Sequence, residues 1–256
     1  ERDMQVALSR NGVVVPEILG WVEDPKTIVM AWVEGGRDAG LIQEAIENAS
    51  AMSPDRWQAS LRYMELLAEL HAIPVEKFAA AGAEMPTNNR QAMLGNFERF
   101  HAMSETLGIT DSFIAFASGW LRRNCPQNTS GLSFLTGDCG QFLSDGPNVT
   151  CLMDFEIGHI GDPMRDLSCY RGRHPIENMG DLPALFAHYA KAAGKPPDLD
   201  AMAWIRHIAP RPVLLMQGGA DQVVSSESGA RLFEAAGEPK ELWVDPEVGH
   251  AQFLKL

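Results

Sequence analysis

The spacing of apolar and polar positions along the chain predicts helices and short strands in a mixed order. Apolar residues recur at helical intervals over residues 4–10, an alternating segment follows, and an apolar run at 28–33 predicts a buried strand. Longer helical patterns follow at residues 53–73, 91–106, 111–123 and 182–193. Near the end, runs at 212–217 and 241–245 flank a helical segment at 227–236, which predicts a β-α-β unit with two parallel strands. The fold class is therefore α+β.

The first of the longer helices has a clear start signal. Ser53 is followed by Pro54 and Asp55, and Ser can accept hydrogen bonds from the free N–H groups of a first helical turn. Proline is tolerated at the first helical position, and an aspartate favours the positive end of the helix dipole. We expect the helix to end before Pro74.

A short hairpin between two aspartates is the most informative segment. Apolar runs at 141–144 and 149–153 flank the turn-forming string Asp-Gly-Pro-Asn at 145–148. Because antiparallel strands run out and back, Asp138 before the first strand and Asp154 after the second should lie at the same end. Two carboxylates brought together repel one another, so such a pair predicts a shared cation or a proton transfer.

Composition limits the classes of function. The chain has 256 residues, 45% hydrophobic content, a net charge of −13 and a pI of about 4.9. Such an acidic chain is not expected to bind nucleic acid or an anionic membrane. Its four cysteines show no metal-site spacing, no apolar run is long enough to span a bilayer, and Glu1 does not open a signal peptide. We expect a cytoplasmic protein whose chain continued upstream of Glu1.

Several motifs around the hairpin occur in a fixed order. They are Leu66 to His71, Thr136-Gly137-Asp138, Asp154-Phe155-Glu156, Gly161-Asp162-Pro163 and Asp166-Leu167. In this order the chain resembles the aminoglycoside and choline kinase-like phosphotransferases over roughly residues 1–200. The resemblance implies a protein-kinase-like fold with an incomplete small lobe and a helical large lobe, and it implies ATP and Mg²⁺ as cofactors.

The resemblance also implies roles for single residues. Asp138 would orient or deprotonate the attacking hydroxyl, and Asp154 would hold Mg²⁺ on the nucleotide phosphates. The family's second metal ligand is an Asn, where this chain has Leu143 at the family spacing and Gln141 as the nearest amide. Thr136, in place of the family's loop histidine, would give structural support together with Asp162 and Asp166.

The nucleotide side of the resemblance is incomplete. The segment Met30-Ala31-Trp32-Val33 resembles the hinge that would hydrogen-bond adenine, although a plain buried strand explains the same pattern. Glu1 matches the helix glutamate that pairs with a strand lysine in kinases, but that lysine is missing and Lys26 lies in a connection after the helix. We therefore expect weak or degenerate activity.

A second resemblance covers residues 208–256, which look like the end of an α/β-hydrolase. Asp221 and His250 match the acid and the histidine of the catalytic triad in that family. No G-x-S-x-G nucleophile motif occurs in the chain, so the pair has no partner serine to activate. The junction between the two resemblances falls near residues 199–208.

Three interpretations follow. The leading one is an ATP- and Mg²⁺-dependent phosphotransferase acting on a hydroxyl of a small molecule, with a small-lobe remnant at 1–36, a helical lobe at 37–200 and a hydrolase-like tail at 205–256. The alternatives are an esterase that uses Asp221 and His250, and a non-catalytic binding remnant. The acidic composition favours a cationic substrate only weakly, and we expect any homo-oligomer to form through the C-terminal segment.

Overall fold

The structure is a computed structural model, and it describes residues 1–37, 52–109, 111–125, 129, 131–174, 178–194, 205, 209–210, 212–220 and 226–249. The chain forms two compact units, Glu1–Ala193 and Gly194–Leu256, which are described separately below. The segments predicted as a small-lobe remnant and a helical lobe both fall in the first unit, apart from the end of the lobe.

The first unit begins with one helix and a hairpin, in the order that the sequence predicts. Helix α1 spans Arg2–Arg10, and strands β1 (Ile18–Glu23) and β2 (Lys26–Met30) pair in an antiparallel sheet. The prediction of a buried strand at 28–33 is wrong, because β2 ends at Met30 and its residues are mostly exposed. The two strands form a two-stranded sheet, and a ribbon of that width leaves much of both its faces open to solvent.

Helices hold more residues of the first unit than strands do, and several of them start with local capping chemistry. The helices are α3 (Pro54–His71), α4 (Glu76–Ala79), α5 (Asn89–Thr106), α6 (Ser112–Arg123), α7 (Met164–Arg173) and α8 (Leu182–Ala192). Ser53 caps α3 by accepting from the Arg56 N–H at 3.2 Å, which confirms the predicted start. Asp111 and Asp181 cap α6 and α8 in the same way.

Two small antiparallel sheets lie between the helices. Strands β4 (Phe142–Asp145) and β5 (Asn148–Leu152) form the predicted hairpin. Strands β3 (Ser133–Leu135) and β6 (His159–Gly161), which the sequence analysis did not predict, pair on either side of it in the chain. The catalytic-type motifs at 136–138 and 154–156 therefore each lie between a strand of one sheet and a strand of the other.

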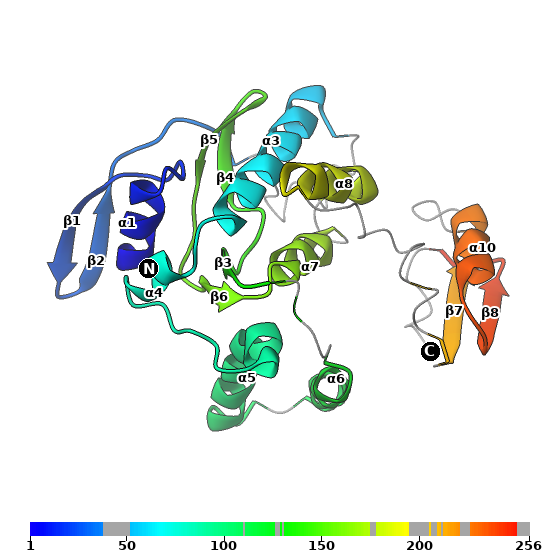
Figure 1. Cartoon of the computed structure of the whole chain (residues 1–256). Helices are drawn as coiled ribbons and strands as arrows, with labels where there is room; N and C mark the ends of the chain where they lie inside the picture. Colours follow the sequence, from blue (N-terminus) through cyan, green and yellow to red (C-terminus); the bar gives the residue numbers. More distant parts are fainter. Residues whose placement is uncertain are drawn as a thin grey trace. The chain divides into compact units, whose positions relative to one another are not determined.

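Helix α3 organises the core of the first unit. It packs against α8, β3 and β5, so it contacts both small sheets (Figure 1). Leu67 on α3 and Phe134 and Leu135 on β3 have no exposed surface. Phe78 stacks on Phe134 with ring centroids 4.4 Å apart, which extends this core to α4. The loops that carry the motifs are thus anchored on a rigid apolar base.

The second unit holds the predicted β-α-β arrangement. Strands β7 (Val213–Gly218) and β8 (Lys240–Asp245) pair in parallel, and helix α10 (Ser226–Ala235) joins them in the chain (Figure 1). Alternate residues of these strands expose large apolar side chains, among them Leu214, Met216 and Trp243.

Within the described residues, the structure contains no helix that is long and apolar enough to cross a membrane.

Candidate active site

The hairpin places the two motif aspartates at one end of the β4–β5 sheet, as the sequence predicts. Phe142 pairs with Leu152, and beyond this pair the Met153 N–H donates to the Gln141 carbonyl at 3.1 Å. Asp154 follows Met153 directly, and Asp138 lies three residues before Gln141. The loop before β4 and the segment after β5 are thus joined by backbone hydrogen bonding.

A glycine brings the same two segments into contact a second time. Gly137 has φ of +83°, and a Cβ atom at this position would lie 2.6 Å from the Ile157 carbonyl oxygen. Only a residue without a side chain fits such a close approach, and only glycine adopts this backbone region without strain. Residues 136–138 therefore pack directly on the segment that follows Asp154.

Asp166 on α7 holds the backbone of Thr136 and Gly137 through hydrogen bonds. Its carboxylate accepts from the Thr136 N–H at 2.8 Å, the Thr136 hydroxyl at 3.0 Å and the Gly137 N–H at 3.1 Å. His71 Nε2 lies 3.2 Å from the same carboxylate, and His71 Nδ1 lies 2.8 Å from the Tyr189 hydroxyl. Because a carboxylate can only accept, His71 Nε2 is the donor, and helices α3, α7 and α8 are linked through this network.

The network keeps Asp166 ionised although only 1% of its side chain is exposed. Burial raises the pKa of this carboxyl, but the hydrogen bond and charge of His71 and the two backbone N–H groups outweigh it and hold the pKa below the usual value. Structural support is the role predicted for Asp166 and Thr136, and it stays a prediction.

Tyr63 on α3 holds the other half of the loop. The Gly140 N–H donates to the Tyr63 hydroxyl at 2.7 Å, and this hydroxyl lies 3.1 Å from Cys139 Sγ. Burial raises the pKa of Tyr63 well above its usual value, so the phenol stays protonated and can donate to the sulfur. Its ring stacks between Phe142 and Tyr170, with centroids 4.8 and 5.9 Å away.

Asp138 itself is paired with a cation and an amide. Arg173 Nη1 lies 2.6 Å from Asp138 Oδ1, and Gln141 Nε2 donates to Asp138 Oδ2 at 2.5 Å. Gln141 Oε1 in turn accepts a hydrogen bond from Arg37. The side chain of Asp138 is 33% exposed, so it remains open to a ligand.

Asp154 has the geometry of a ligand-binding carboxylate. Its φ of +66° makes it the one non-glycine residue with positive φ in the described chain, a conformation that surrounding structure must hold in place. Its half-buried carboxylate accepts no hydrogen bond from the described residues. These features fit one protein ligand to Mg²⁺, which commonly takes only one or two carboxylates in sites that also hold phosphates.

Gln141 fits that ion less well. Its side-chain oxygen, the only atom that could bind a metal, accepts from Arg37, and its nitrogen points to Asp138. Moreover, the described residues contain no group of three or more His, Cys, Asp or Glu side chains placed to hold a metal. As the structure stands, Gln141 positions Asp138, and its predicted role as a metal ligand stays a prediction.

Asp162, the remaining residue predicted to give structural support, lies two residues before the start of α7. Its Oδ1 accepts from the Met164 N–H at 2.8 Å at the start of α7, and its own N–H donates to the Ala92 carbonyl at 3.1 Å. Asp162 thus joins α7 to α5, and α7 in turn carries Asp166 and Arg173.

The predicted hinge residues have mixed surroundings. Met30 ends β2, and the Ala31 N–H donates to the Glu17 carbonyl at 2.8 Å. Trp32 is 84% exposed, and its indole N–H donates to Glu34. Ala31 therefore uses its N–H within the protein, while Val33 is half-buried. A nucleotide contact by these residues stays a prediction.

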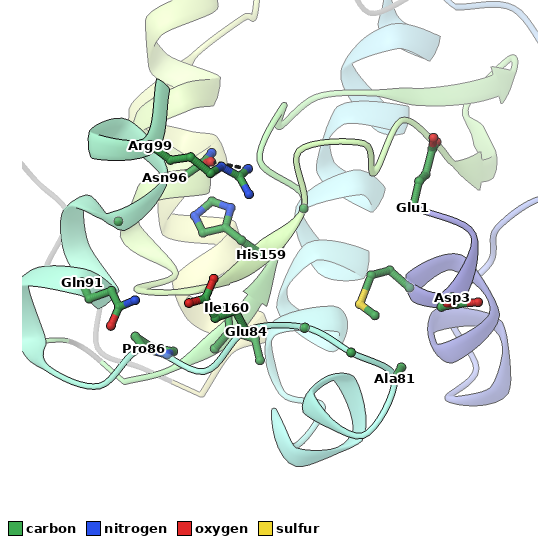
Figure 2. Close-up of a pocket in the computed structure, with 15 residues that line it drawn as sticks. Glu1, Asp3, Ala81, Glu84, Pro86, Gln91, Asn96, Arg99, His159 and Ile160 are labelled. Atoms are coloured by element: carbon green, nitrogen blue, oxygen red, sulfur yellow. Dashed lines mark hydrogen bonds between the residues drawn. The ribbon is translucent and has the colours of Figure 1, made fainter. Parts of the chain in front are cut away.

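A cavity of about 670 Å³ lies between the start of α1, the 81–86 loop, α5 and β6. Figure 2 shows His159 at its centre, with the hydrogen-bonded Asn96 and Arg99 on one side and Glu1 and Asp3 on the other. Burial raises the pKa of the Glu1 carboxyl, and the negative charges of Asp154 and Glu156 raise it further. This coupling places Glu1 near the Asp154 segment, although Asp154 and Asp138 do not line the cavity.

The alternative hydrolase pair, Asp221 and His250, lies outside the described residues, as does most of the predicted junction at 199–208.

Several residues of the site escaped the sequence analysis as functional positions. They are Arg37, Tyr63, His71 and Arg173. Asp166 and Arg173 are seven residues apart on α7 and so lie on one face, as do Tyr63 and His71 on α3. Polar residues on a buried helix face were the signal in the sequence that could have revealed the functional positions on α3 and α7.

The comparisons with known proteins agree with this geometry. The structure resembles macrolide 2'-phosphotransferase MphH from Brachybacterium faecium, with 20% identity over 76% of this chain and 64% of that one and a TM-score of 0.50. It also resembles the GDP complex of aminoglycoside 2'-phosphotransferase-IIIa, with 19% identity over 77% and 66% of the two chains and a TM-score of 0.53. A choline/ethanolamine kinase family protein from Mesorhizobium loti gives 16% identity, 81% and 64% coverage, and a TM-score of 0.51.

These likenesses show a kinase-like fold. The chain belongs to the phosphotransferase enzyme family, whose model matches residues 1–205. The predicted family resemblance is therefore confirmed, whereas the hydrolase-like resemblance of the tail finds no support in the comparisons. The chain spans 64–66% of the length of the three structures above. No curated protein sequence matches it.

Proposed function

We propose that this chain carries the acceptor side of a nucleotide-dependent phosphotransferase that phosphorylates a hydroxyl group of a small molecule. The observation that supports this most is the joint anchoring of the Asp138 loop and the Asp154 segment, by the Gln141–Met153 hydrogen bond and the Gly137–Ile157 contact. Phosphoryl transfer depends on positioning and charge neutralisation more than on covalent chemistry, so two rigidly held carboxylates are its main requirement.

The reaction assigns one task to each aspartate. Asp138 accepts the proton of the acceptor hydroxyl while a bond forms from its oxygen to the γ-phosphorus and the bond to the leaving nucleoside diphosphate breaks. Asp154 would hold Mg²⁺, which when bound neutralises charge on the nucleotide phosphates. Gln141 and Arg173 keep the Asp138 carboxylate in one orientation. The products are a phosphate monoester, a nucleoside diphosphate and a proton.

A calorimetric titration of the full chain with Mg·ATP, followed by single-turnover transfer assays, tests the proposal. Asp154→Ala should abolish Mg²⁺-dependent nucleotide binding, and Asp138→Asn should keep binding but lose transfer. Turnover of the unmodified chain should fall below the roughly 1 to 100 per second typical of kinases, because the Gln141 amide, held by Arg37 and Asp138, is a poor replacement for the family's second metal ligand.

Asp145→Asn is the matched control, since Asp145 is an exposed carboxylate at the turn of the same hairpin and should change neither step. Mg²⁺-dependent binding that survives Asp154→Ala would contradict the assignment, and a chain that binds no nucleotide would favour a non-catalytic binding function.

A further inference from the structure

Two arginines converge on the candidate catalytic aspartate. Arg173, at the end of α7, contacts Asp138 Oδ1 at 2.6 Å, and only 15% of its side chain is exposed. Arg37 reaches the same place from the segment after β2, because Gly36 pairs with Ser144 through two backbone hydrogen bonds of 2.8 and 2.9 Å. From there Arg37 donates to the Gln141 oxygen.

These contacts determine what surrounds an incoming hydroxyl. A hydroxyl that Asp138 deprotonates must come within about 3 Å of a carboxylate oxygen. Asp138 Oδ1 already accepts a hydrogen bond from Arg173, and Asp138 Oδ2 accepts one from the Gln141 amide nitrogen. The Gln141 side-chain oxygen in turn accepts from Arg37. At Oδ1 the substituents next to the hydroxyl meet the Arg173 guanidinium, and at Oδ2 they meet the Gln141 amide, with the Arg37 guanidinium one residue beyond.

We propose that the acceptor molecule carries an oxyanion, a carboxylate or a phosphate, close to the hydroxyl that is phosphorylated. Guanidinium groups present planar pairs of N–H donors that match such oxyanions. An ammonium group at the same position would be repelled by both arginines. The substrate class is thus a hydroxylated acid, and this inference rests on the proposed function.

The charged groups close to Asp138 favour a different kind of substrate from the one that the net charge of the whole chain suggests. The net charge of −13 weakly favoured a cationic substrate. Screening limits charges at the surface to a range of about 8 Å at physiological ionic strength, so Arg173 on Asp138 and Arg37 on Gln141 count for more at the reacting hydroxyl than distant surface carboxylates do.

A matched series of ligands tests the proposal by titration calorimetry on the full chain at low salt. Gluconate, sorbitol and glucamine share one polyol skeleton and differ in a terminal carboxylate, hydroxymethyl or aminomethyl group. Gluconate should bind at least about tenfold more tightly than sorbitol, the gain expected from one charge-assisted contact, and glucamine should bind weakest. Sorbitol 6-phosphate shows whether a phosphate serves better than a carboxylate.

Variants then locate the effect. Arg173→Gln should remove the preference for gluconate, and Arg173→Lys should restore part of it, because lysine keeps the charge but not the planar donor pair. Arg171→Gln is the matched control, since Arg171 is exposed on the same helix. If Arg173→Gln unfolds the protein, Arg37→Gln replaces it, because Arg37 is exposed and should weaken gluconate binding by several-fold.

The outcomes separate this inference from the proposed function. Equal binding of the three polyols, tighter binding of glucamine, no gluconate binding, or the same loss in Arg171→Gln would each overturn it. The Mg·ATP titration of the same samples reports on the phosphotransferase proposal alone. If the chain binds nucleotide but not gluconate, the proposed substrate class is wrong and the proposed phosphotransferase function stands. If it binds gluconate through Arg173 but binds no nucleotide, it has an acid-binding site and the proposed phosphotransferase function is wrong.

Discussion

At the scale of single residues, Asp166 combines deep burial with several hydrogen-bond donors and one partner of potential opposite charge, His71. Replacing it with Asn keeps the shape but removes the charge that these donors face. We expect Asp166→Asn to lower the free energy of unfolding by about 2–3 kcal/mol, in the range for charged hydrogen bonds in buried sites. Urea denaturation at pH 7 measures the change. Asp181→Asn, which keeps an exposed helix cap, should stay within about 0.5 kcal/mol.

The lowered pKa of Asp166 gives the same residue a pH signature. The folded state binds this proton less readily than the unfolded state does. Its stabilising contribution is therefore present above the unfolded pKa, near 3.8, and is lost as the pH falls through the lower folded value. Stability of the unmodified chain should drop more steeply below about pH 4 than that of Asp166→Asn. Parallel acid profiles would argue against an ionised, stabilising Asp166.

Tyr63 makes a second prediction at this scale. Tyr63→Phe keeps the stacked ring but removes the acceptor of the buried Gly140 N–H. An unsatisfied buried donor costs about 1–3 kcal/mol, so the variant should lose stability by that amount. Tyr63→Leu should cost more, because it also removes the stacking. A Tyr63→Phe protein as stable as the original would show that water or a shifted loop satisfies Gly140.

The sequence predicted the positions of Asp138 and Asp154 because a hairpin is a local structure whose ends meet by necessity. It could not predict Arg173 on Asp138 or Arg37 on Gln141, which are separated by 35 and 104 residues in the chain. Contacts over such separations depend on how helices and loops pack. An isolated arginine in a sequence carries no sign of its partner.

At the scale of elements, the joint between the 136–138 loop and the segment after Asp154 depends on Gly137. An alanine there would meet the Ile157 carbonyl and would have to adopt φ of +83°. We expect Gly137→Ala to cost at least about 2 kcal/mol from strain and displacement, and to abolish transfer activity. Thermal unfolding and the single-turnover assay measure the two effects.

Gly172→Ala is a control for which the opposite change in stability is expected. Gly172 lies within α7, and an added Cβ would meet nothing within 4 Å. Gly172→Ala should therefore stabilise the protein by roughly 0.5–1 kcal/mol through helix propensity. If both alanine variants behaved alike, the contact with Ile157 would not be what requires glycine at position 137.

Elements with strong local signals were predicted well, and elements defined by their partners were not. Helices α3, α6 and α8 each begin after a capping side chain that is visible in the sequence. Strands β3 and β6 have three residues each and exist because they pair with each other, which no local pattern announces. The run at 28–33 is apolar enough for a buried strand, yet within the described part of the chain its sheet has one other strand.

At the scale of the whole molecule, the two units have different means of stability. The first contains its own apolar core, including Met64, Leu67 and Leu185 without exposed surface. The second has one two-stranded parallel sheet with Leu214, Met216 and Trp243 exposed, in the described residues. A two-stranded sheet is marginal alone, so the second unit depends on further contacts that bury these side chains.

Truncation after Gly194 tests this difference. A chain of residues 1–194 keeps α3, α8 and both small sheets, so it should unfold cooperatively with a midpoint within about 4 °C of the full chain, equivalent to roughly 1 kcal/mol. Its Mg·ATP titration should also be unchanged. The prediction of oligomers through the C-terminal segment requires concentration-dependent self-association of the full chain in sedimentation velocity. The truncated chain should show none, because the exposed sheet face is removed. A truncated chain without a cooperative transition would show that residues after 194 complete the core of the first unit.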